Sequence, residues 1–341
     1  MPKKNKENNS HSLFKRPNKI PVYNEEPYGT ISQSNALNNI FRINNKRNTK
    51  ELPFNKKQIQ TDAVTAITEK AHLGLAEAQM LDYINYRFNQ LSDHEHIKRF
   101  SFTLKEYMKD AEKKDPKTTR NAIKQRLDII ASTTYSYDGG DKQNPYNQNF
   151  GAHPLLGYDY KQGKIYIELT DFFHDLLVYH SMPMAYYKLM FKLDPRKDAT
   201  AMYILRTLIE NKRINKTSPR ANRIKVKTLL AKIPSLPSYD EVIKTNRHIY
   251  DRIIAPVLKG VERLAQPDER ERAIIRYSFI GSAAKPLDYD SLDYDSFINA
   301  DLIIEEWNQY PEADLEKWDK KQKQIRKKQI RKKQEKKNNK K

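Results

Sequence analysis

The chain has 341 residues, which is enough for two domains of ordinary size. It contains no cysteine, which excludes disulfides and thiolate metal sites, and no apolar run reaches the roughly 18–20 residues that a membrane-spanning helix needs. Lys and Arg number 63 against 43 Asp and Glu, and the formal net charge of +20 has the sign that attracts phosphate-rich partners.

Residues 1–57 are predicted to form a disordered basic tail. They are rich in Asn, Lys, Ser and Pro and carry twelve basic and four acidic residues. Their apolar and aromatic residues are scattered, so that only a short docking strand stays open as an alternative. The opening residues MPKKNKENNSHS lack the apolar core of a secretory signal, and we therefore expect a soluble protein in the cytoplasm.

Residues 61–131 have the apolar spacing of helices. The pattern predicts one helix before Gly74 and a second that continues to Phe88. Thr103 followed by Glu106 matches a capping box and predicts a helix that runs to about residue 112. Asp115-Pro116 is expected to break it, and a longer helix follows over residues 118–131.

The side of this last helix that faces away from its apolar residues carries side chains that contact phosphates and read base edges. They are Lys117, Arg120, Asn121, Lys124 and Gln125. A plain solvated helix face fits the same pattern, and both interpretations stay open on the helix alone.

Strands are predicted directly after this helix. Residues 133–137 alternate toward Asp138-Gly139-Gly140, and residues 155–160 and 164–169 flank Gln162-Gly163 as a second hairpin. Strands in this position are typical of the wing of a winged helix. We therefore predict a first winged-helix domain over residues 58–180, which ends in a connecting helix capped by Thr170.

Residues 191–265 predict a second helix-turn-helix, with helices over residues 199–211, 225–233 and 246–264. Strands over residues 273–280 and 297–305 would form its wing. Between residues 196 and 232 there are eleven Lys or Arg against two acids, whereas residues 288–316 hold ten acids and no Lys or Arg. Such separated charge steers one face of a domain toward DNA. We predict a second winged-helix, DNA-binding domain over residues 181–312.

The third of these helices has an apolar stripe and a basic stripe, as a recognition helix needs. Asn246 is a candidate N-cap, which would place Arg247, His248 and Arg252 in the base-contacting turns, with Lys259 further along. Pro256 is expected to kink or divide the helix. The basic residues that precede this helix are predicted to anchor phosphates: Lys212, Arg213, Lys216, Arg220, Arg223, Lys225 and Lys227.

Residues 313–341 are predicted to form a basic tail rich in Lys and Arg, in which QIRKK occurs twice. From residue 317 onward it has fourteen basic and two acidic residues, which leaves 37 residues of each sign between residues 58 and 316. The predicted folded part is therefore neutral. The tail favours either sequence-blind affinity for nucleic acid or simple solubility.

No pattern predicts catalysis. His94-Glu95-His96 is a poor match to a metal-binding pair, Tyr186-Tyr187-Lys188 a weak match to a nucleophile motif, and no GxxxxGK[ST] phosphate loop occurs. The alternating acids from Asp288 to Asp295 are better explained as solvated than as a calcium site. We expect no enzyme activity, no cofactor and no bound metal.

The segments KLDPRKDATAMYILRTL, RIKVKTLLAKIPSLPSYDEV, NRHIYDRIIAPVLKGVERL and LDYDSFINADLIIEEWNQYPE resemble plasmid replication initiators of the tandem winged-helix, iteron-binding family. The resemblance covers residues 182–312, and the first predicted domain only by its architecture. It implies binding to repeated sequences of a replication origin, local origin opening, recruitment of a host initiator and replicative helicase, and homodimers. The long polar ends depart from a compact initiator.

The expected fold class is α+β and mostly helical, with two tandem winged-helix (helix-turn-helix) domains between disordered basic tails. The leading functional hypothesis is sequence-specific binding of double-stranded DNA at a replication origin of a plasmid or mobile element. A winged-helix transcriptional regulator is the first alternative, and an origin-nicking enzyme is the second.

Overall fold

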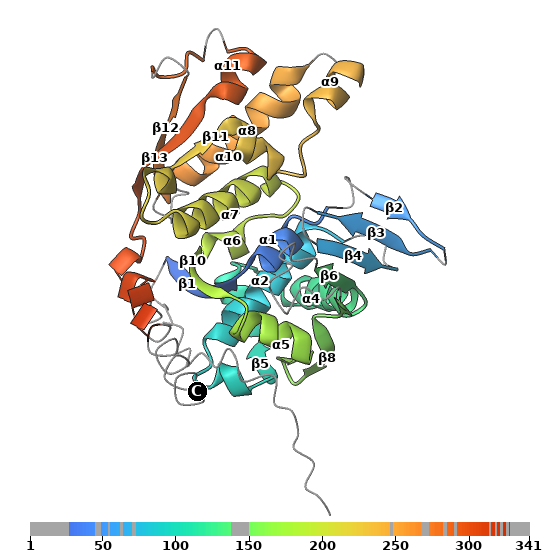
Figure 1. Cartoon of the computed structure of the whole chain (residues 1–341). Coiled ribbons are helices and arrows are strands. Elements are labelled where there is room, and N and C mark those ends of the chain that lie inside the picture. Colours follow the sequence, from blue (N-terminus) through green and yellow to red (C-terminus); the bar gives the residue numbers. More distant parts are fainter. Residues whose placement is uncertain are drawn as a thin grey trace, which may run out of the picture.

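Two sets of elements with the same order along the chain make up most of the fold, which mixes helices with antiparallel strands (Figure 1). The computed structural model describes residues 27–44, 49–53, 55–61, 64–69, 73–137, 150–245, 248–266, 273–281, 285–289, 292–313, 315–317, 319–320, 323–324 and 327. Within these residues, no helix is both long and apolar enough to cross a membrane.

The first set, here called the first unit, has α2 (Leu75–Asn89), β5 (Arg99–Thr103), α3 (Leu104–Asp110), α4 (Pro116–Ala131), β8 (Leu155–Lys161) and β9 (Lys164–Leu169). The second unit has α7 (Ala199–Ile214), β11 (Arg223–Lys225), α8 (Val226–Ala231), the π-helical segment η4 (Tyr250–Ile254), α10 (Ala255–Ala265), β12 (Ile275–Ile280) and β13 (Asp301–Trp307). Their sheets have the orders β5–β9–β8 and β11–β13–β12, so that the last strand of each unit is central.

Local signals place the ends of the first unit's elements where the sequence predicts them. The Thr103 hydroxyl accepts a hydrogen bond from the Glu106 backbone N–H, and the Glu106 carboxylate bonds back to the Thr103 N–H, which completes the capping box of α3. Asp115 caps α4 and Pro116 occupies its first turn. Gln162 and Gly163 both have positive φ, at 52° and 75°, as a tight hairpin turn between β8 and β9 requires.

Residues 27–44 contradict the predicted disorder of residues 1–57. They form β1 (Tyr28–Gln33) and α1 (Asn35–Phe41), and β1 pairs antiparallel with β10 (Met182–Tyr187), the strand that leads into the second unit through α6 (Leu189–Lys192). Ile31, Ile40 and Phe41 are buried. The few apolar residues of this polar segment therefore pack against partners that lie far away in the sequence.

The helix predicted before Gly74 is also wrong. Residues 64–68 form β4 (Val64–Thr68), which joins β2 (Thr49–Glu51), β3 (Lys57–Gln60), β6 (Thr134–Tyr137) and β7 (Phe150–Ala152) in a sheet of order β2–β3–β4–β6–β7. Val64 and Ala66 are buried and alternate with half-buried Thr65 and Ile67, which is the two-residue period of a strand. β6 has the predicted position, and its predicted turn at residues 138–140 lies outside the described residues.

In the second unit the third helix runs without a break from residue 249 to 265, and its turn ahead of Pro256 is π-helical, so the helix is not divided at Pro256. A separate helix, α9 (Tyr239–Thr245), precedes it, η4 forms the next turn, and α10 contains Pro256 in its first turn. Asn246 and Arg247 lie outside the described residues. The strand predicted over residues 297–305 begins too early, because α11 (Tyr294–Asn299), capped by the Asp293 carboxylate, precedes β13.

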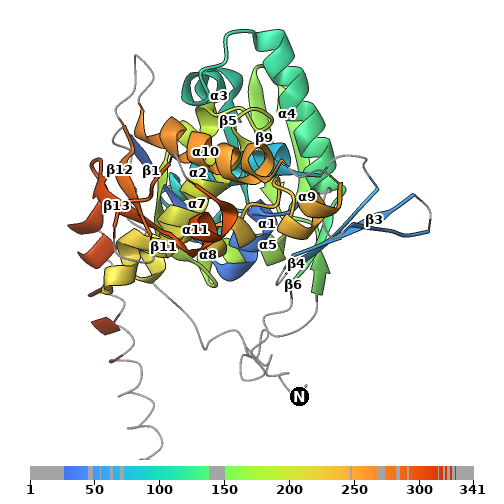
Figure 2. The ribbon, with the colours of Figure 1, turned by 90° about the horizontal axis from the view of Figure 1, so that it is seen from above.

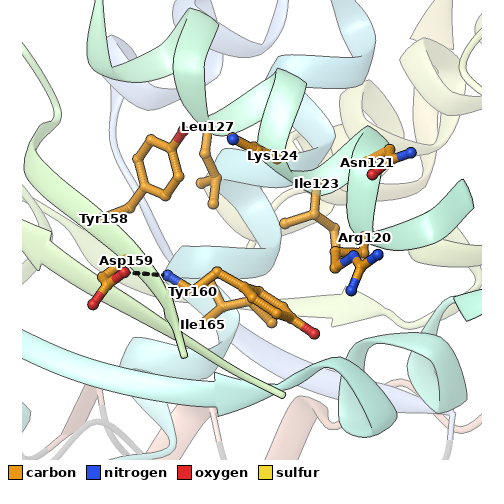
Figure 3. Close-up of a pocket in the computed structure, with 9 residues that line it drawn as sticks. All are labelled: Arg120, Asn121, Ile123, Lys124, Leu127, Tyr158, Asp159, Tyr160 and Ile165. Atoms are coloured by element: carbon orange, nitrogen blue, oxygen red, sulfur yellow. Dashed lines mark hydrogen bonds between the residues drawn. The ribbon is translucent and has the colours of Figure 1, made fainter. Parts of the chain in front are cut away.

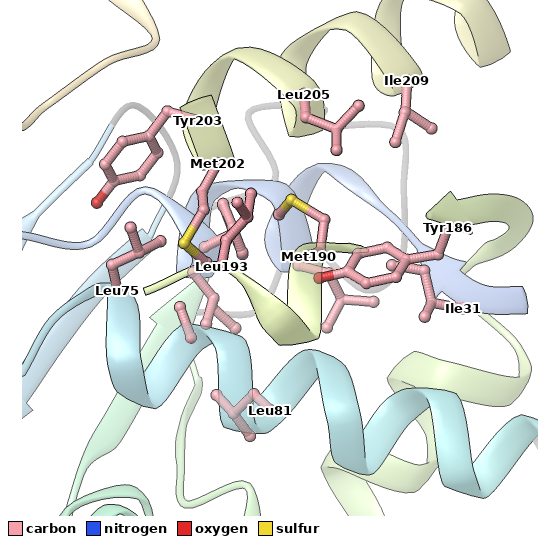
Figure 4. Packing of buried hydrophobic residues seen from close by; sticks show 14 of the residues in the cluster. Ile31, Leu75, Leu81, Tyr186, Met190, Leu193, Met202, Tyr203, Leu205 and Ile209 are labelled. Carbon is pink, nitrogen blue, oxygen red and sulfur yellow. The ribbon is translucent and has the colours of Figure 1, made fainter. Parts of the chain in front are cut away.

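One apolar core continues from the first unit into the second (Figure 4). Leu75 and Leu81 of α2 lie on one side of it, and Met202 and Leu205 of α7 lie on the other, with Met190 between them. The two units are therefore packed against each other.

The crossing of α10 over α7 is close at Gly260. A Cβ atom at this position would lie 2.9 Å from Ile204 Cδ1, 3.0 Å from Thr200 Cγ2 and 3.2 Å from the Ala201 backbone nitrogen. We expect Gly260→Val to destabilise the chain by about 1–3 kcal/mol, because the helices must move apart. The midpoint of thermal unfolding would report it. Gly157→Val is the matched control, since a Cβ there meets nothing within 4 Å, and an equal loss in both variants would contradict this packing.

Candidate nucleic-acid interface

The α4 helix presents the predicted DNA-contacting residues together. Lys117, Arg120, Asn121, Lys124 and Gln125 are all exposed. Ile123, Leu127 and Ile130 are buried on the opposite side, where α4 packs against α2. Burial of these apolar residues sets the rotation of the helix, and it turns the amide and basic side chains outward.

A groove of about 520 Å³ separates α4 from the neighbouring strand β8 (Figure 3). Arg120, Asn121 and Lys124 line it from the helix, and Tyr158, Asp159 and Tyr160 line it from the strand. The Arg120 guanidinium carbon lies 5.9 Å from the centre of the Tyr160 ring, which is a cation–π distance. The Tyr158 hydroxyl donates to the Asp128 carboxylate, so the strand and the helix are held in a fixed relation.

Sequence reasoning missed Tyr158 and Tyr160 as part of this surface. The signal that identifies them is their alternation along a strand that follows a basic helix, since residues i and i+2 of a strand lie on the same face. The groove brings aromatic rings and cationic side chains together, a combination suited to nucleic acid.

In the second unit, the corresponding position is taken by η4 and α10. Ile253, Ile254, Val257 and Val261 are buried, as the apolar stripe predicts. His248 and Lys259 are exposed, and Arg252 is half-buried. The His248 ring nitrogen lies 3.9 Å from the Asp251 carboxylate, so an acid borders this surface.

Three of the predicted phosphate anchors hold the C-terminal segment instead of facing outward. The Arg213 guanidinium is buried and donates to both carboxylate oxygens of Asp319 at 3.0 and 3.1 Å, and it also donates to the Pro183 carbonyl at 2.8 Å. The Lys216 ammonium pairs with the same Asp319. The buried Lys212 lies 3.5 Å from Glu312 and over the Tyr310 ring.

Of the remaining four predicted anchors, one is paired with an acid and the other three are exposed. Arg223 is exposed, but its guanidinium lies 2.5 Å from the Asp301 carboxylate, and this hydrogen bond raises the pKa of Arg223. Arg220, Lys225 and Lys227 are exposed. Three acids, Asp301, Glu312 and Asp319, thus pair with four of the seven anchor positions, and the other three stay suited to phosphates.

The motifs that were considered for catalysis occupy structural positions. Tyr186 and Tyr187 are fully buried, and burial raises the pKa of Tyr186 well above its ordinary value. His94 is buried against Phe88, and its Nδ1 lies 3.0 Å from the Leu91 carbonyl oxygen. Among the described residues, no group of three or more His, Cys, Asp or Glu side chains is placed to hold a metal ion.

Comparisons with known proteins find similarity in structure. No family model and no curated protein sequence matches the chain. The structure is similar to that of the Pi initiator protein in complex with iteron DNA, with a TM-score of 0.46 and 10% identity, covering 82% of this chain and 98% of that chain.

Two further neighbours are structures of domains 2 and 3 of RctB. Their TM-scores are 0.39 and 0.41, with 9% and 11% identity. They cover 83% and 75% of this chain, and 92% and 89% of the respective RctB chains.

Proposed function

We propose that the protein binds double-stranded DNA sequence-specifically at the repeated sites of a replication origin and starts replication of a plasmid or related mobile element without catalysis of its own. The observation that carries this proposal is the exposed face of α4. Five side chains that contact phosphates or read bases lie there together, on a helix that is fixed by its buried apolar side and bordered by strand β8.

We further propose that each unit is a winged helix, with domains over residues 58–180 and 181–312. Supporting this, α4 and η4–α10 follow the same elements, pack against α2 and α7 in turn, and precede the strands of sheets with the same order. In a winged helix, such a helix enters the major groove and the following strands contact the flanking backbone. Residues 27–44 precede both domains in the sequence, but in space they contact α2 of the first and β10 and α7 of the second.

In this mechanism, Arg120, Asn121 and Lys124 read bases in one major groove. Arg247, His248 and Arg252 read bases in another, with Lys259 beside them. Lys117 and Gln125 in the first unit and Arg220, Lys225 and Lys227 in the second contact phosphates. Dimer formation and recruitment of a host initiator and helicase are part of the same proposal, and they follow from the resemblance of the sequence.

Mapping the protected DNA of the protein's own replicon tests the proposal. We expect two protected patches per repeat, in successive major grooves, because the two proposed reading helices belong to units that share one apolar core. A single patch per repeat would restrict DNA reading to one unit. Protection that is independent of sequence would contradict base reading altogether.

Genetic tests separate the proposal from its alternatives. Deletion of the reading frame should abolish autonomous replication of its replicon, whereas a transcriptional regulator would change only transcript levels. Formation of a covalent tyrosyl adduct with origin DNA would establish a nicking enzyme. The full burial of Tyr186 and Tyr187 is unfavourable to that last reaction.

A further inference from the structure

The junction between the two units carries a second group of cations, outside those discussed above. Arg196 and Lys197 are exposed in the loop between α6 and α7. In the turn between α3 and α4, Lys113 is half-buried and Lys114 is exposed. The two loops belong to different units and are separated by about eighty residues of sequence.

Several contacts place these loops next to each other. The Lys192 ammonium of α6 lies 2.9 Å from the Glu112 carboxylate of the α3–α4 turn. Burial acts to raise the pKa of Asp194, but the pKa still lies below its ordinary value. Hydrogen bonds from the backbone N–H groups of Arg196 and Lys197 lower it, and so do the nearby positive charges of Lys113 and Lys197. Lys113 therefore lies close to the loop that carries Arg196 and Lys197.

The α6–α7 loop is held in one conformation by its own acids. The Asp194 carboxylate accepts from the Arg196 and Lys197 backbone N–H groups at 2.8 and 3.1 Å, and the Asp198 carboxylate accepts from the Asp194 N–H at 2.9 Å. The α2 side chain Gln79 donates to the carbonyl that precedes Asp194 at 3.0 Å. The acids of this loop are thus hydrogen-bonded to its backbone, while the side chains of Arg196 and Lys197 are exposed to solvent.

This loop also adjoins the proposed reading helix of the second unit. It leads directly into the first turn of α7, and Gly260 of α10 lies against Thr200 and Ala201 in that turn. Lys259, next to Gly260, is exposed. Seen from above, α10 lies on the side of α7 that is turned toward α3 and α4 (Figure 2). The cations of the junction therefore lie between the proposed reading helices.

We propose that Arg196 and Lys197, with Lys113 and Lys114, form a phosphate-binding bridge that contacts the DNA backbone between the two sites read by the units. This inference rests on the proposed function. Guanidinium and ammonium groups bind phosphate oxygens regardless of base sequence, so the bridge contributes affinity and correct placement of the DNA. It leaves the choice of bases to α4 and η4–α10.

The test compares the full chain with its Arg196→Gln/Lys197→Gln variant on the protein's own origin DNA over a range of salt concentrations. We expect the slope of log affinity against log salt to become shallower by about 2, because two phosphate contacts and their released counterions are lost. The ratio of affinities for origin and scrambled DNA should stay the same. Both side chains are exposed, so the melting temperature should not change.

Lys50→Gln/Lys98→Gln is the control, because it removes two exposed cations that lie on β2 and before β5; the Lys98 ammonium also pairs with Asp171 at 2.8 Å. A second arm uses origin DNA with neutral methylphosphonate linkages between the two protected patches. The wild type should bind this neutral-linkage DNA more weakly than natural DNA. The bridge variant should bind the two DNAs equally well.

An unchanged salt slope in the variant, or an equal effect of the neutral linkages on both proteins, would overturn the bridge while leaving the proposed function intact. A loss of discrimination between origin and scrambled DNA would assign these residues to base reading and would also overturn it. Absence of sequence-specific binding by the wild type would overturn the proposed function and this inference with it.

Discussion

Replacing Arg206 with Leu is expected to lower the free energy of unfolding by about 3–5 kcal/mol, because it leaves a buried carboxylate without its cation. The Arg206 side chain is fully buried in α7. Its guanidinium donates to Asp82 of α2 at 2.8 Å and to Asn38 of α1 at 3.2 Å. Chemical denaturation with urea, followed by circular dichroism, would measure the loss.

The surroundings of Arg206 explain why the loss should be large. The guanidinium carbon lies 5.0 Å from the centre of the Phe41 ring and 5.7 Å from that of Tyr186, so the cation is enclosed by aromatic faces. Arg42, which directly follows α1, and Glu210 of α7 form a second buried pair beside it, at 2.5 Å. These groups join α1, α2 and α7, and the network therefore spans both units.

The destabilisation should depend on pH in the direction set by the buried carboxylates beside Arg206, of which Asp82 is the nearer at 2.8 Å and Glu210 the other at 3.6 Å. Burial raises the pKa of Asp82 to about 6, although Arg206 and the Tyr186 hydroxyl act to lower it. The pKa of Asp82 is thus higher in the folded chain than in the unfolded chain. Asp82 therefore favours folding at a pH below its pKa in the unfolded chain, and this contribution is lost as the pH rises through about 6. In Arg206→Leu, the unpaired carboxylate costs more when ionised, so the loss should be larger at pH 8 than at pH 5.

The exposed Arg99 of β5 supplies the control, since Arg99→Leu should change stability by no more than about 0.5 kcal/mol. A loss in Arg206→Leu below about 1 kcal/mol would contradict a network that holds the units together. An equal loss at pH 5 and pH 8 would show that packing, and not the charge of Asp82, is responsible.

Elements with local signals were predictable from the sequence, because the signal and the element share the same few residues. The capping box at Thr103, the break at Asp115-Pro116 and the Gln162-Gly163 turn all lie where predicted, although α4 starts at Pro116, two residues earlier than expected. The π-helical turn directly ahead of Pro256 is a local effect of the same kind, although the helix is not divided there. In each case the physical cause is a backbone hydrogen bond or a fixed φ angle that needs no distant partner.

Elements that depend on distant partners were missed. The β1 strand and α1 helix lie in a polar segment, and their few apolar residues become meaningful only when β10 and α7 are in place. In β4, Ala66 and Ile67 fit a helical spacing by coincidence over a short window. The β-branched Val64, Thr65 and Thr68 beside them are better suited to the strand that pairs with β6.

In the candidate site, too, residues that depend on local structure were predictable and residues that depend on distant partners were not. The residues of α4 were placed on one face because a regular helix fixes the direction of every side chain once its buried side is known. Lys212, Arg213 and Lys216 were interpreted as phosphate anchors because their partners, Glu312 and Asp319, lie about a hundred residues away. A local excess of charge does not show which charges are already paired in the fold.

Removing one proposed reader from each unit should have the largest effect on DNA binding. Each bidentate contact of an arginine with guanine contributes about 1–3 kcal/mol of discrimination, so Arg120→Ala and Arg252→Ala should each weaken binding to origin DNA by that amount. The two positions lie in separate units, and their effects should add. The double variant should then bind origin DNA roughly 30-fold to 10⁴-fold more weakly, which brings it toward its affinity for unrelated DNA.

Fluorescence anisotropy at one fixed salt concentration, with origin and scrambled duplexes in parallel, would measure these affinities. Arg99→Ala/Arg276→Ala is the control, since it too removes one arginine from each unit, here from β5 and β12; Arg276 also pairs with Glu305 and Glu306. An equal loss on both duplexes would demote Arg120 and Arg252 to phosphate contacts. An Arg120→Ala variant that binds like the wild type would confine base reading to the second unit. Additive losses confined to origin DNA require both units to read the same molecule at once, because a unit that is not bound cannot lose a base contact.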